Sequence, residues 1–301
     1  MKHLFIINPV AGRKKNGREM ADKINAIFAD REEEYEIVFT EYPDHATEIA
    51  AMAAKSDEPT RIYAIGGDGT LHEVVQGCYH AKNIQIAPVP NGTGNDFVKA
   101  FPDYDFTDIE KLVDGTGTVV DLLTCGDNVS LNIINCGFDA QVAGNVNKFK
   151  KVFTGSLAYY IALFYTFIQR INSDIVVSVD GYDFYRGKSL LTVAANGRVY
   201  GGGFLAAPDA RYDDGLIDIV VVKKLSRLKI TGFVGKYKSG NHQPLMHLMR
   251  KCRGKAITIS STTPFAISFD GEVEMTKEAK IELVEKALTI VLPAGTQRDG
   301  M

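Results

Sequence analysis

The sequence lacks the features of several large protein classes. It contains no apolar stretch of the ~20 residues that a membrane span requires. Its first apolar run, residues 4–7, ends at Asn8-Pro9, so no secretory signal is expected. The four cysteines are scattered without CxxC spacing, which is typical of free thiols in a reducing cytoplasm. The six histidines form no HExxH pair, and a zinc site is therefore not expected.

Two common nucleotide-binding signatures are also missing. No GxxxxGK[ST] phosphate loop occurs, because the glycines at positions 12 and 17 are followed by Arg18 and Glu19. No GxGxxG follows a predicted strand, which disfavours a dehydrogenase. The net charge of −3 gives no indication of a nucleic-acid partner.

The chain of 301 residues is long enough for two domains with sizeable cores. In residues 1–122, predicted strands alternate with predicted helices, which is typical of a doubly wound, parallel α/β sheet. The strands are expected at 4–7, 35–40, 61–65 and 84–89, and the helices at 17–29, 46–55 and 71–79.

The hydrophobic pattern changes in residues 123–287, and it predicts an antiparallel, β-rich second domain. Strand-like runs at 129–135, 175–179, 190–195, 216–222 and 256–260 are separated by Asp-Gly turn signals at 180–181, 214–215 and 270–271. The run 287–292 is a candidate strand of the first domain, which residues 288–301 would then complete.

Glycine-rich loops follow three of the predicted parallel strands, at 8–12, 66–70 and 90–96. In Gly66-Gly67-Asp68-Gly69-Thr70, three glycines let another molecule approach the backbone. Thr70 and Glu73 have the spacing of a capping box, which predicts a helix start there. A strand, a glycine loop and a helix N-terminus in this order favour an anion, and we expect a nucleotide phosphate. The carboxyl ends of parallel strands share one edge, so the three loops predict one site.

Several acids are candidates for metal binding and catalysis. Asp68 and Asp96 lie inside glycine loops, where they either cap turns or hold Mg²⁺ against phosphate. A third cluster, residues 208–216, either caps a turn or binds a cation. Glu272 follows a predicted hairpin turn, and a partly buried carboxylate there would have a raised pKa and suit a general base.

Two helical segments interrupt the β pattern. Residues 156–168 are apolar nearly all round, which predicts a buried helix or the wall of an acyl-chain pocket. Residues 223–255 contain ten Lys and Arg residues and no Asp or Glu. This region is either a solvated face or a surface for anionic lipid, and its part 225–249 would suit a helix lying on a bilayer.

Taken together, the motifs resemble the diacylglycerol kinase catalytic family, in particular its soluble bacterial lipid kinases. The resemblance rests on the loops at 8–12, 66–70 and 90–96, and continues through 135–139, 195–197, 201–203, 208–216 and 269–272. Sphingosine kinases are relatives, and NAD kinases share the fold and the second loop. The PNGTGND loop and the terminal FDGE favour a lipid acceptor over NAD.

The resemblance implies an NAD kinase-like nucleotide-binding domain, a β-sandwich-like second domain and ATP bound in the cleft between them. It implies an ATP- and Mg²⁺-dependent lipid kinase, with diacylglycerol as the first candidate acceptor, and Asp68, Asp96 and Glu272 as catalytic residues, Glu272 being the base. Mg²⁺ would be held by Asp214 with the carbonyls of Arg211 and Leu216, and Asp121 would join the surrounding water network. The implied ATP contacts are Asn8, Pro9, Val10, Ala11, Gly12, Thr40, Gly66, Gly67, Asp68, Gly69, Thr70, Leu71, His72, Asn91, Gly92 and Thr93.

Two alternatives remain open from the sequence. One is an NAD kinase-like enzyme with a soluble acceptor, and the other is a non-catalytic sensor of lipid or nucleotide. The expected location is the cytoplasm, at the inner face of the membrane. The expected partners are a lipid substrate and an anionic membrane surface reached through residues 223–255, with no nucleic acid. The oligomeric state, including a homodimer, is left open.

Overall fold

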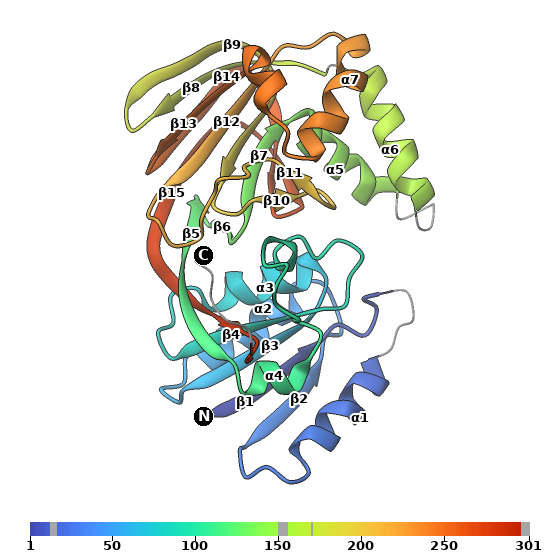
Figure 1. The fold of residues 1–301 in the computed structure, drawn as a ribbon, viewed down its shortest axis with the longest axis vertical. Coiled ribbons are helices and arrows are strands. Elements are labelled where there is room, and N and C mark those ends of the chain that lie inside the picture. Colours follow the sequence, from blue (N-terminus) through green and yellow to red (C-terminus); the bar gives the residue numbers. More distant parts are fainter. Residues whose placement is uncertain (13–16, 150–155, 170, 296–301) are drawn as a thin grey trace. The chain divides into compact units, whose positions relative to one another are not determined.

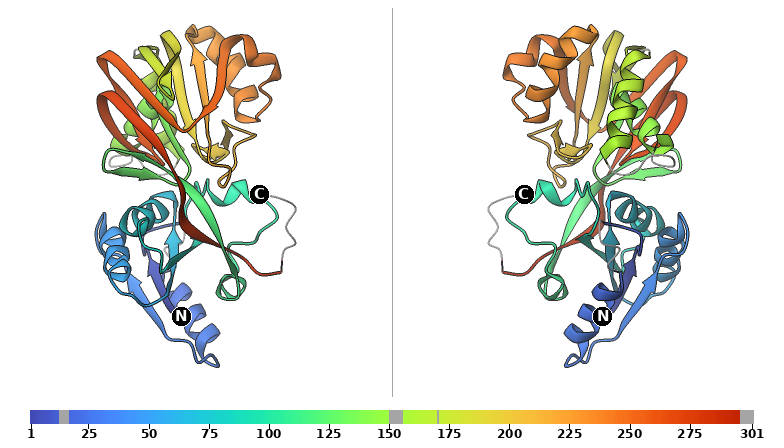
Figure 2. Two further views of the ribbon diagram at one scale, coloured as in Figure 1. Left: turned by 90° about the vertical axis from the view of Figure 1, so that its left-hand side faces the viewer. Right: turned by 90° about the vertical axis from the view of Figure 1, so that its right-hand side faces the viewer.

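The computed structural model describes residues 1–12, 17–149, 156–169 and 171–295, which form two compact units. The first unit comprises Met1–Leu122 and the chain from Glu285 onward, and the second comprises Leu123–Val284. Both boundaries fall inside strands. Strand β5 (Thr116–Cys125) and strand β15 (Glu272–Leu292) are each continuous through both units (Figure 2).

The first unit is a parallel α/β sheet in the order β2-β1-β3-β4-β15. The central strand β3 is buried along its whole length, as expected for a parallel strand covered on both faces. The strands that precede β5 are β1 (Lys2–Ile7), β2 (Tyr35–Phe39), β3 (Thr60–Gly66) and β4 (Ile84–Pro90). The helices are α1 (Gly17–Phe28), α2 (His45–Ala54), α3 (Asp68–Cys78), η1 (Val98–Ala100) and α4 (Ile109–Val113).

The second unit is mainly antiparallel β structure, and Figure 1 shows its strands together with helices α5, α6 and α7. Its order is β13-β12-β9-β7-β14-β15, with β8 paired to both β14 and β9. Its strands are β6 (Asn128–Ser130), β7 (Ile133–Gly137), β8 (Ser173–Val179), β9 (Tyr182–Ala195), β10 (Val199–Tyr200), β11 (Phe204–Leu205), β12 (Ile217–Lys223), β13 (Met249–Gly254) and β14 (Ala256–Phe269). Its helices are α5 (Phe138–Phe149), α6 (Ser156–Ile168), α7 (Arg227–Lys238) and η2 (Gln243–Leu248).

Alternating side chains divide the core of the second unit into two clusters. Val193 belongs to one cluster and its chain neighbour Ala194 to the other, because successive strand residues face opposite sides. The first cluster includes side chains of α5 and α7, and Phe167 of α6 packs against it. The three helices therefore cover the same face of the sheet. The chain is a mixed α/β protein with a β-rich second domain, as the sequence predicted.

The predicted hairpin turns are confirmed at two of three places. Asp180-Gly181 joins β8 to β9, and Asp270-Gly271 joins β14 to β15, with positive φ at all four residues. The third signal, at 214–215, is not a hairpin, since the strand that follows it, β12, pairs with β9 and β13. The predicted run 129–135 is two strands, β6 and β7, separated by Leu131 and Asn132.

The predicted helix starts need correction. Helix α3 begins at Asp68 with Gly67 at its N-cap, so Thr70 is inside the first turn and the predicted capping box does not form. The Glu73 carboxylate instead accepts a hydrogen bond from the Ala46 N–H of α2. The third glycine loop leads into the short helix η1.

The two interrupting helical segments also differ from expectation. Residues 156–168 form α6, but Phe164 is 69% exposed and Ile168 is 59% exposed, so the described part of this helix is not buried all round. The segment 225–249 is not one helix, since α7 and η2 are separate elements.

Candidate functional site

The first unit brings its three glycine-rich loops to one edge, because the strands that precede them are parallel neighbours. The Asn8 N–H donates to the Ile65 carbonyl (2.9 Å), and the Asn91 N–H donates to the Gly66 carbonyl (2.7 Å). These two bonds connect the first residue after β1 and after β4 to the end of β3. Thr40, which follows β2, lies at the same edge, because its N–H donates a hydrogen bond to the Ile7 carbonyl (2.9 Å).

Asp68 fastens the second loop to the third. Its carboxylate oxygens accept hydrogen bonds from the backbone N–H groups of Asn95 (Oδ2, 2.7 Å) and Asp96 (Oδ1, 2.6 Å). Asn95 has φ +55° and braces its own loop, since its amide exchanges hydrogen bonds with the backbone N–H and C=O of Gly92. Asp68 therefore positions Asp96 through the backbone.

The loops approach so closely that glycine is required at their contacts. A Cβ on Gly92 would collide with the Cα of Gly67, and a Cβ on Gly94 would collide with the Asp68 carboxylate. A Cβ on Gly12 would lie 2.7 Å from the Asn91 carbonyl oxygen, where φ is also positive (+77°). The glycines serve close packing between the loops as well as access for a ligand.

The first turn of α3 begins inside the second loop and belongs to the same site. Gly67 offers no capping side chain, and the first N–H groups of any helix have no partner within the helix. The Asn8 side-chain amide donates to the Thr70 hydroxyl (3.1 Å), and its carbonyl accepts from the Val10 N–H (3.1 Å). The Nδ1 atom of His72 is buried without a hydrogen-bond partner among the described residues. The arrangement suits a phosphate group at a helix N-terminus.

Asp96 is only 7% exposed, and its charge is balanced within its own turn. Its Oδ1 atom lies 2.9 Å from the Nζ atom of Lys99. An ammonium group at this distance would also stabilise additional negative charge beside the carboxylate. Lys99 was not among the residues predicted from the sequence.

In the second unit, the predicted acid cluster is organised by Arg253 of β13. Its guanidinium donates to Asp218 Oδ1 (3.0 Å), Asp214 Oδ2 (3.4 Å) and the carbonyl of Asp209 (2.9 Å). The other carboxylate oxygen of Asp214 accepts the Leu216 N–H (3.1 Å). Arg211 does not join this group but pairs with Asp213, with 3.3 Å between Nε and Oδ1.

This cluster has the donor chemistry of a Mg²⁺ site, although no group of three or more potential His, Cys, Asp or Glu ligands is found in the described part of the chain. The cluster offers carboxylate and carbonyl oxygens, which Mg²⁺ prefers. The Oδ2 atom of Asp218 is buried without a hydrogen-bond partner in the structure as described, and burial raises the pKa of this carboxyl. Asp218 was not among the predicted ligands.

Asp270 and Glu272, which lie at and just after the turn between β14 and β15, have different environments. The Asp270 carboxylate accepts backbone N–H groups from Leu131 (2.9 Å), Asn132 (3.3 Å) and Ile133 (2.8 Å), so it anchors the segment between β6 and β7. Glu272 is the first residue of β15 and is exposed. The expectation that Glu272 is partly buried is therefore wrong.

Asp139, in the first turn of α5, has an environment that the sequence did not reveal. Burial raises the pKa of its carboxyl to about 6, while a hydrogen bond from the Tyr200 hydroxyl (2.6 Å) acts in the opposite direction. The other acid that the resemblance assigns, Asp121 of β5, is buried and accepts the backbone N–H of Lys286 (2.8 Å). It thereby connects β5 to β15.

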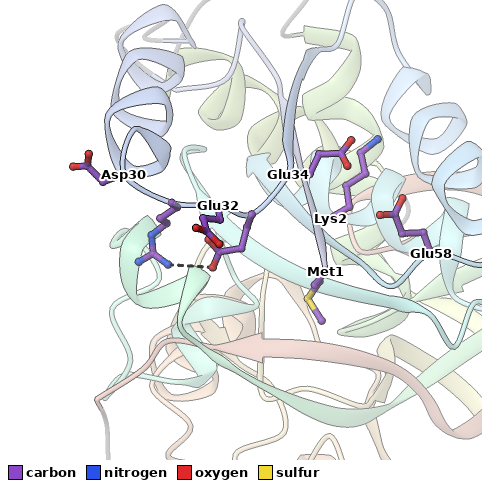
Figure 3. A pocket seen from close by; sticks show the side chains of 8 residues that line it. Met1, Lys2, Asp30, Glu32, Glu34 and Glu58 are labelled. Atoms are coloured by element: carbon purple, nitrogen blue, oxygen red, sulfur yellow. Dashed lines mark ion pairs between the residues drawn. The ribbon is translucent and has the colours of Figure 1, made fainter.

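An open depression of about 670 Å³ lies at the opposite edge of the first unit, where the parallel strands begin (Figure 3). Figure 3 shows Glu34 and Glu58 beside Lys2 at the start of β1. The lining also contains Asp30, Arg31, Glu32 and Glu33. The lining has more carboxylates than cations, and this excess of negative charge repels phosphate groups. This depression is therefore not the phosphate site.

The structure thus brings the predicted residues of the first unit together, namely 8–12, Thr40, 66–72 and 91–93, with Asp96 held beside them. Asn95, Lys99, Arg253 and Asp218 were missed. Only Asn95 had a signal in the sequence, because Asn tolerates positive φ in a glycine loop.

Comparison with known proteins gives consistent results along the whole chain. The sequence profile of the diacylglycerol kinase catalytic domain matches residues 2–125, and that of the YegS C-terminal NAD kinase beta sandwich-like domain matches residues 132–292. A Staphylococcus aureus protein named "Diacylglycerol kinase" is 28% identical over 294 residues, covering 96% of this chain and 91% of the relative. A Stenotrophomonas maltophilia protein named "Probable lipid kinase YegS-like" is 31% identical over 249 residues, covering 78% and 79%.

A solved structure extends the likeness to the fold. The crystal structure of a diacylglycerol kinase from Bacillus anthracis matches with a TM-score of 0.71 over 98% of each chain, at 21% identity. Among the helices that the structure describes, none has the length and apolar character needed to cross a membrane.

Proposed function

Since the chain belongs to the diacylglycerol kinase family of lipid kinases, with a YegS-type second domain, we propose that it transfers the γ-phosphate of ATP to a lipid hydroxyl with Mg²⁺ as cofactor. Diacylglycerol is the proposed acceptor, because relatives that match over nearly the whole chain bear this name. The product would then be phosphatidic acid. The four free cysteines suit the cytoplasm as the proposed location.

The observation that carries this proposal is the fastening of the three glycine loops to one another at the start of α3. Asp68 joins the second loop to the third, and Asn8 joins the first loop to Thr70. Backbone N–H groups and the positive end of the helix dipole can then bind the phosphates of ATP with little reorganisation. Phosphoryl transfer depends mainly on such positioning and on electrostatic stabilisation.

We assign three carboxylates different tasks in the reaction. Asp68 holds the backbone of the third loop, which keeps Asp96 beside the phosphate-binding edge. Asp96, paired with Lys99, would orient the phosphates of ATP and the cofactor. Glu272, exposed at the start of β15, can accept the proton of the lipid hydroxyl as it attacks.

The cofactor is proposed to have oxygen ligands in both units. Asp68 and Asp96 are the candidates beside ATP, and Asp214 with the carbonyls of Arg211 and Leu216 are the candidates in the acid cluster. Mg²⁺ bound to phosphate would neutralise charge that develops during transfer. Asp218, whose Oδ2 atom has no partner among the described residues, is an additional candidate in the cluster.

The test is phosphate transfer from labelled ATP to diacylglycerol in mixed micelles, with and without Mg²⁺. Glu272→Gln keeps the shape of the base but cannot accept the proton, and we expect a loss of at least ~10²-fold in kcat. Glu274→Gln is the matched control, because Glu274 is also exposed and lies two residues further along the same strand. It should retain most of the activity.

Three results would contradict the proposal. Formation of NADP from NAD without any phosphorylated lipid would show an NAD kinase-like activity instead. ATP binding without transfer to any lipid of a total extract would indicate a sensor. Equal activity of Glu272→Gln and Glu274→Gln would remove Glu272 from the role of base.

A further inference from the structure

Two segments of the second unit carry positive charge and no negative charge. Residues 140–173 contain four Lys and Arg and no Asp or Glu, and residues 223–255 contain ten and again none. The whole chain, by contrast, has more acids (37) than Lys and Arg (34). The first segment contains most of α5 and all of α6, and the second contains α7, η2 and β13.

Helix α7 presents an apolar side chain to solvent between positively charged ones. Its buried residues Ile230, Phe233 and Tyr237 form one stripe that packs on the core. At 100° per residue, Leu228 projects from the opposite side, and it is 88% exposed. Lys229 and Lys236 lie on one flank of Leu228, and Arg227 and Lys238 on the other.

Helix α6 adds a second exposed apolar stripe. Phe164, Tyr165 and Ile168 are exposed at spacings that place them on one side of the helix, while Thr166 is buried. The Thr166 hydroxyl accepts a hydrogen bond from the side-chain amide of Asn145 (2.9 Å), which fixes α6 against α5. The outward direction of the exposed stripe is thus set by a buried polar contact.

Arg227 joins the two stripes. Its guanidinium donates to the carbonyls of Phe167 (2.8 Å), Ile168 (3.2 Å) and Gln169 (2.7 Å), at the C-terminal end of α6. A cation at this helix end is favourable because it satisfies the last carbonyls and the helix dipole. The bonds bring the exposed Ile168 and Leu228 to the same junction.

Only part of the basic region is available to a partner. Arg253 is bound to the acid cluster, the Lys251 ammonium lies 2.7 Å from the Nδ1 atom of His242, and Lys223 donates to the His247 carbonyl. Lys229 and Lys236 are exposed, and neither has an ion pair with a residue that the structure describes. Lys224 and Arg250 are also exposed but lie outside α7, so Lys229 and Lys236 are the exposed lysines beside Leu228.

We propose that this surface, defined by Phe164, Ile168, Leu228, Lys229 and Lys236, docks the protein on a bilayer of anionic phospholipid. Its charge is complementary to anionic headgroups, and flanking lysines can extend their ammonium groups to the headgroups while apolar side chains enter the acyl boundary. Few apolar side chains take part, so the contact is shallow and reversible. The proposal concerns binding to the bilayer and does not depend on which lipid is phosphorylated.

The experiment measures sedimentation of the full chain with vesicles that are neutral or contain anionic phospholipid, at low and high salt. Binding should rise with anionic lipid and fall with salt. Each lysine near an anionic surface strengthens binding about fivefold, so Lys229→Glu with Lys236→Glu should weaken it at least about thirtyfold. Leu228→Ser, which changes an exposed position, should weaken it about tenfold.

Matched controls lie on the first unit. Lys55→Glu with Lys82→Glu changes the net charge equally at exposed lysines, and Met52→Ser removes another exposed apolar side chain, one that is 72% exposed. These variants should bind as the unchanged protein does. Equal weakening by test and control variants, or equal binding to neutral vesicles, would overturn the proposal.

Two further measurements separate docking on a bilayer from self-association and from the kinase reaction. If Leu228→Ser dissociated a dimer in sedimentation velocity and left vesicle binding unchanged, the surface would be an interface between copies, and the proposal would fail. Kinase activity in detergent micelles should be the same for the α7 variants and the unchanged protein. A kinase that is inactive in micelles but binds vesicles as expected would refute the proposed function alone.

Discussion

The fastening of the two glycine loops by Asp68 can be measured directly at two amide protons. The Asn95 and Asp96 N–H groups both donate to this carboxylate. Replacing Asp68 by Asn removes the charge and puts an NH₂ donor where one N–H needs an acceptor. A hydrogen bond to a charged group contributes ~1.5–3 kcal/mol, so at least this much local stability should be lost.

Hydrogen exchange at these amides reports local opening of the loop. With about 1.4 kcal/mol for each tenfold change, the Asn95 and Asp96 amides of Asp68→Asn should exchange about 10- to 100-fold faster than in the unchanged protein. Amides of β3, which is buried on both sides, should keep their protection. The assay is amide exchange at residue resolution by NMR, in the absence of nucleotide.

Asp103→Asn is the control for this experiment. It removes the same charge from an exposed position of the first unit that no described hydrogen bond involves. It should leave both amides unchanged. If Asp68→Asn also left them unchanged and still reduced catalysis, Asp68 would act on ATP or the metal alone, and its role as a fastener would be refuted.

The two remaining predictions concern stability. Gly92→Ala should lower the free energy of unfolding by ~1–3 kcal/mol, because its Cβ would collide with Gly67. Gly69→Ala should be neutral or stabilising, because a Cβ there meets no atom within 4 Å. Thermal unfolding of both variants tests this prediction, and equal melting temperatures would contradict it. A second prediction concerns His3, whose pKa burial lowers from 6.5 to about 4. The neutral ring therefore favours folding above pH 6.5. This stabilisation, roughly 3 kcal/mol, is lost as the pH falls towards 4. Urea unfolding between pH 4.5 and 7.5 should therefore show a smaller pH dependence for His3→Gln. An identical slope would show that folding does not shift the pKa of His3.

The order of elements in the first unit could be predicted from the sequence, because parallel strands are continuous apolar runs and the loops between them are rich in glycine. The helix start was harder to place. Thr70 and Glu73 have the spacing of a capping box, but the Glu73 carboxylate accepts from the N-terminus of α2, which is distant in sequence. A tertiary contact replaced the local one.

The residues of the candidate site that lie in the glycine loops could be predicted from the sequence. The residues that meet through pairing between strands were missed. Arg253 contacts Asp218 because β12 and β13 are antiparallel with these two residues in register. No spacing in the sequence indicates that pairing. Glu272 was located at the turn as expected, but exposure of a residue beside a hairpin depends on which elements cover it, and the local pattern does not contain that information.

The acidic depression makes the charge distribution of the first unit asymmetric. Carboxylates gather where the parallel strands begin, and backbone N–H groups with a helix N-terminus gather where they end. An anion that diffuses towards this unit is repelled at one edge and attracted at the other, so collisions at the wrong edge are short-lived. The charges of the depression would thus raise the rate at which a nucleotide reaches the glycine loops, most strongly at low ionic strength.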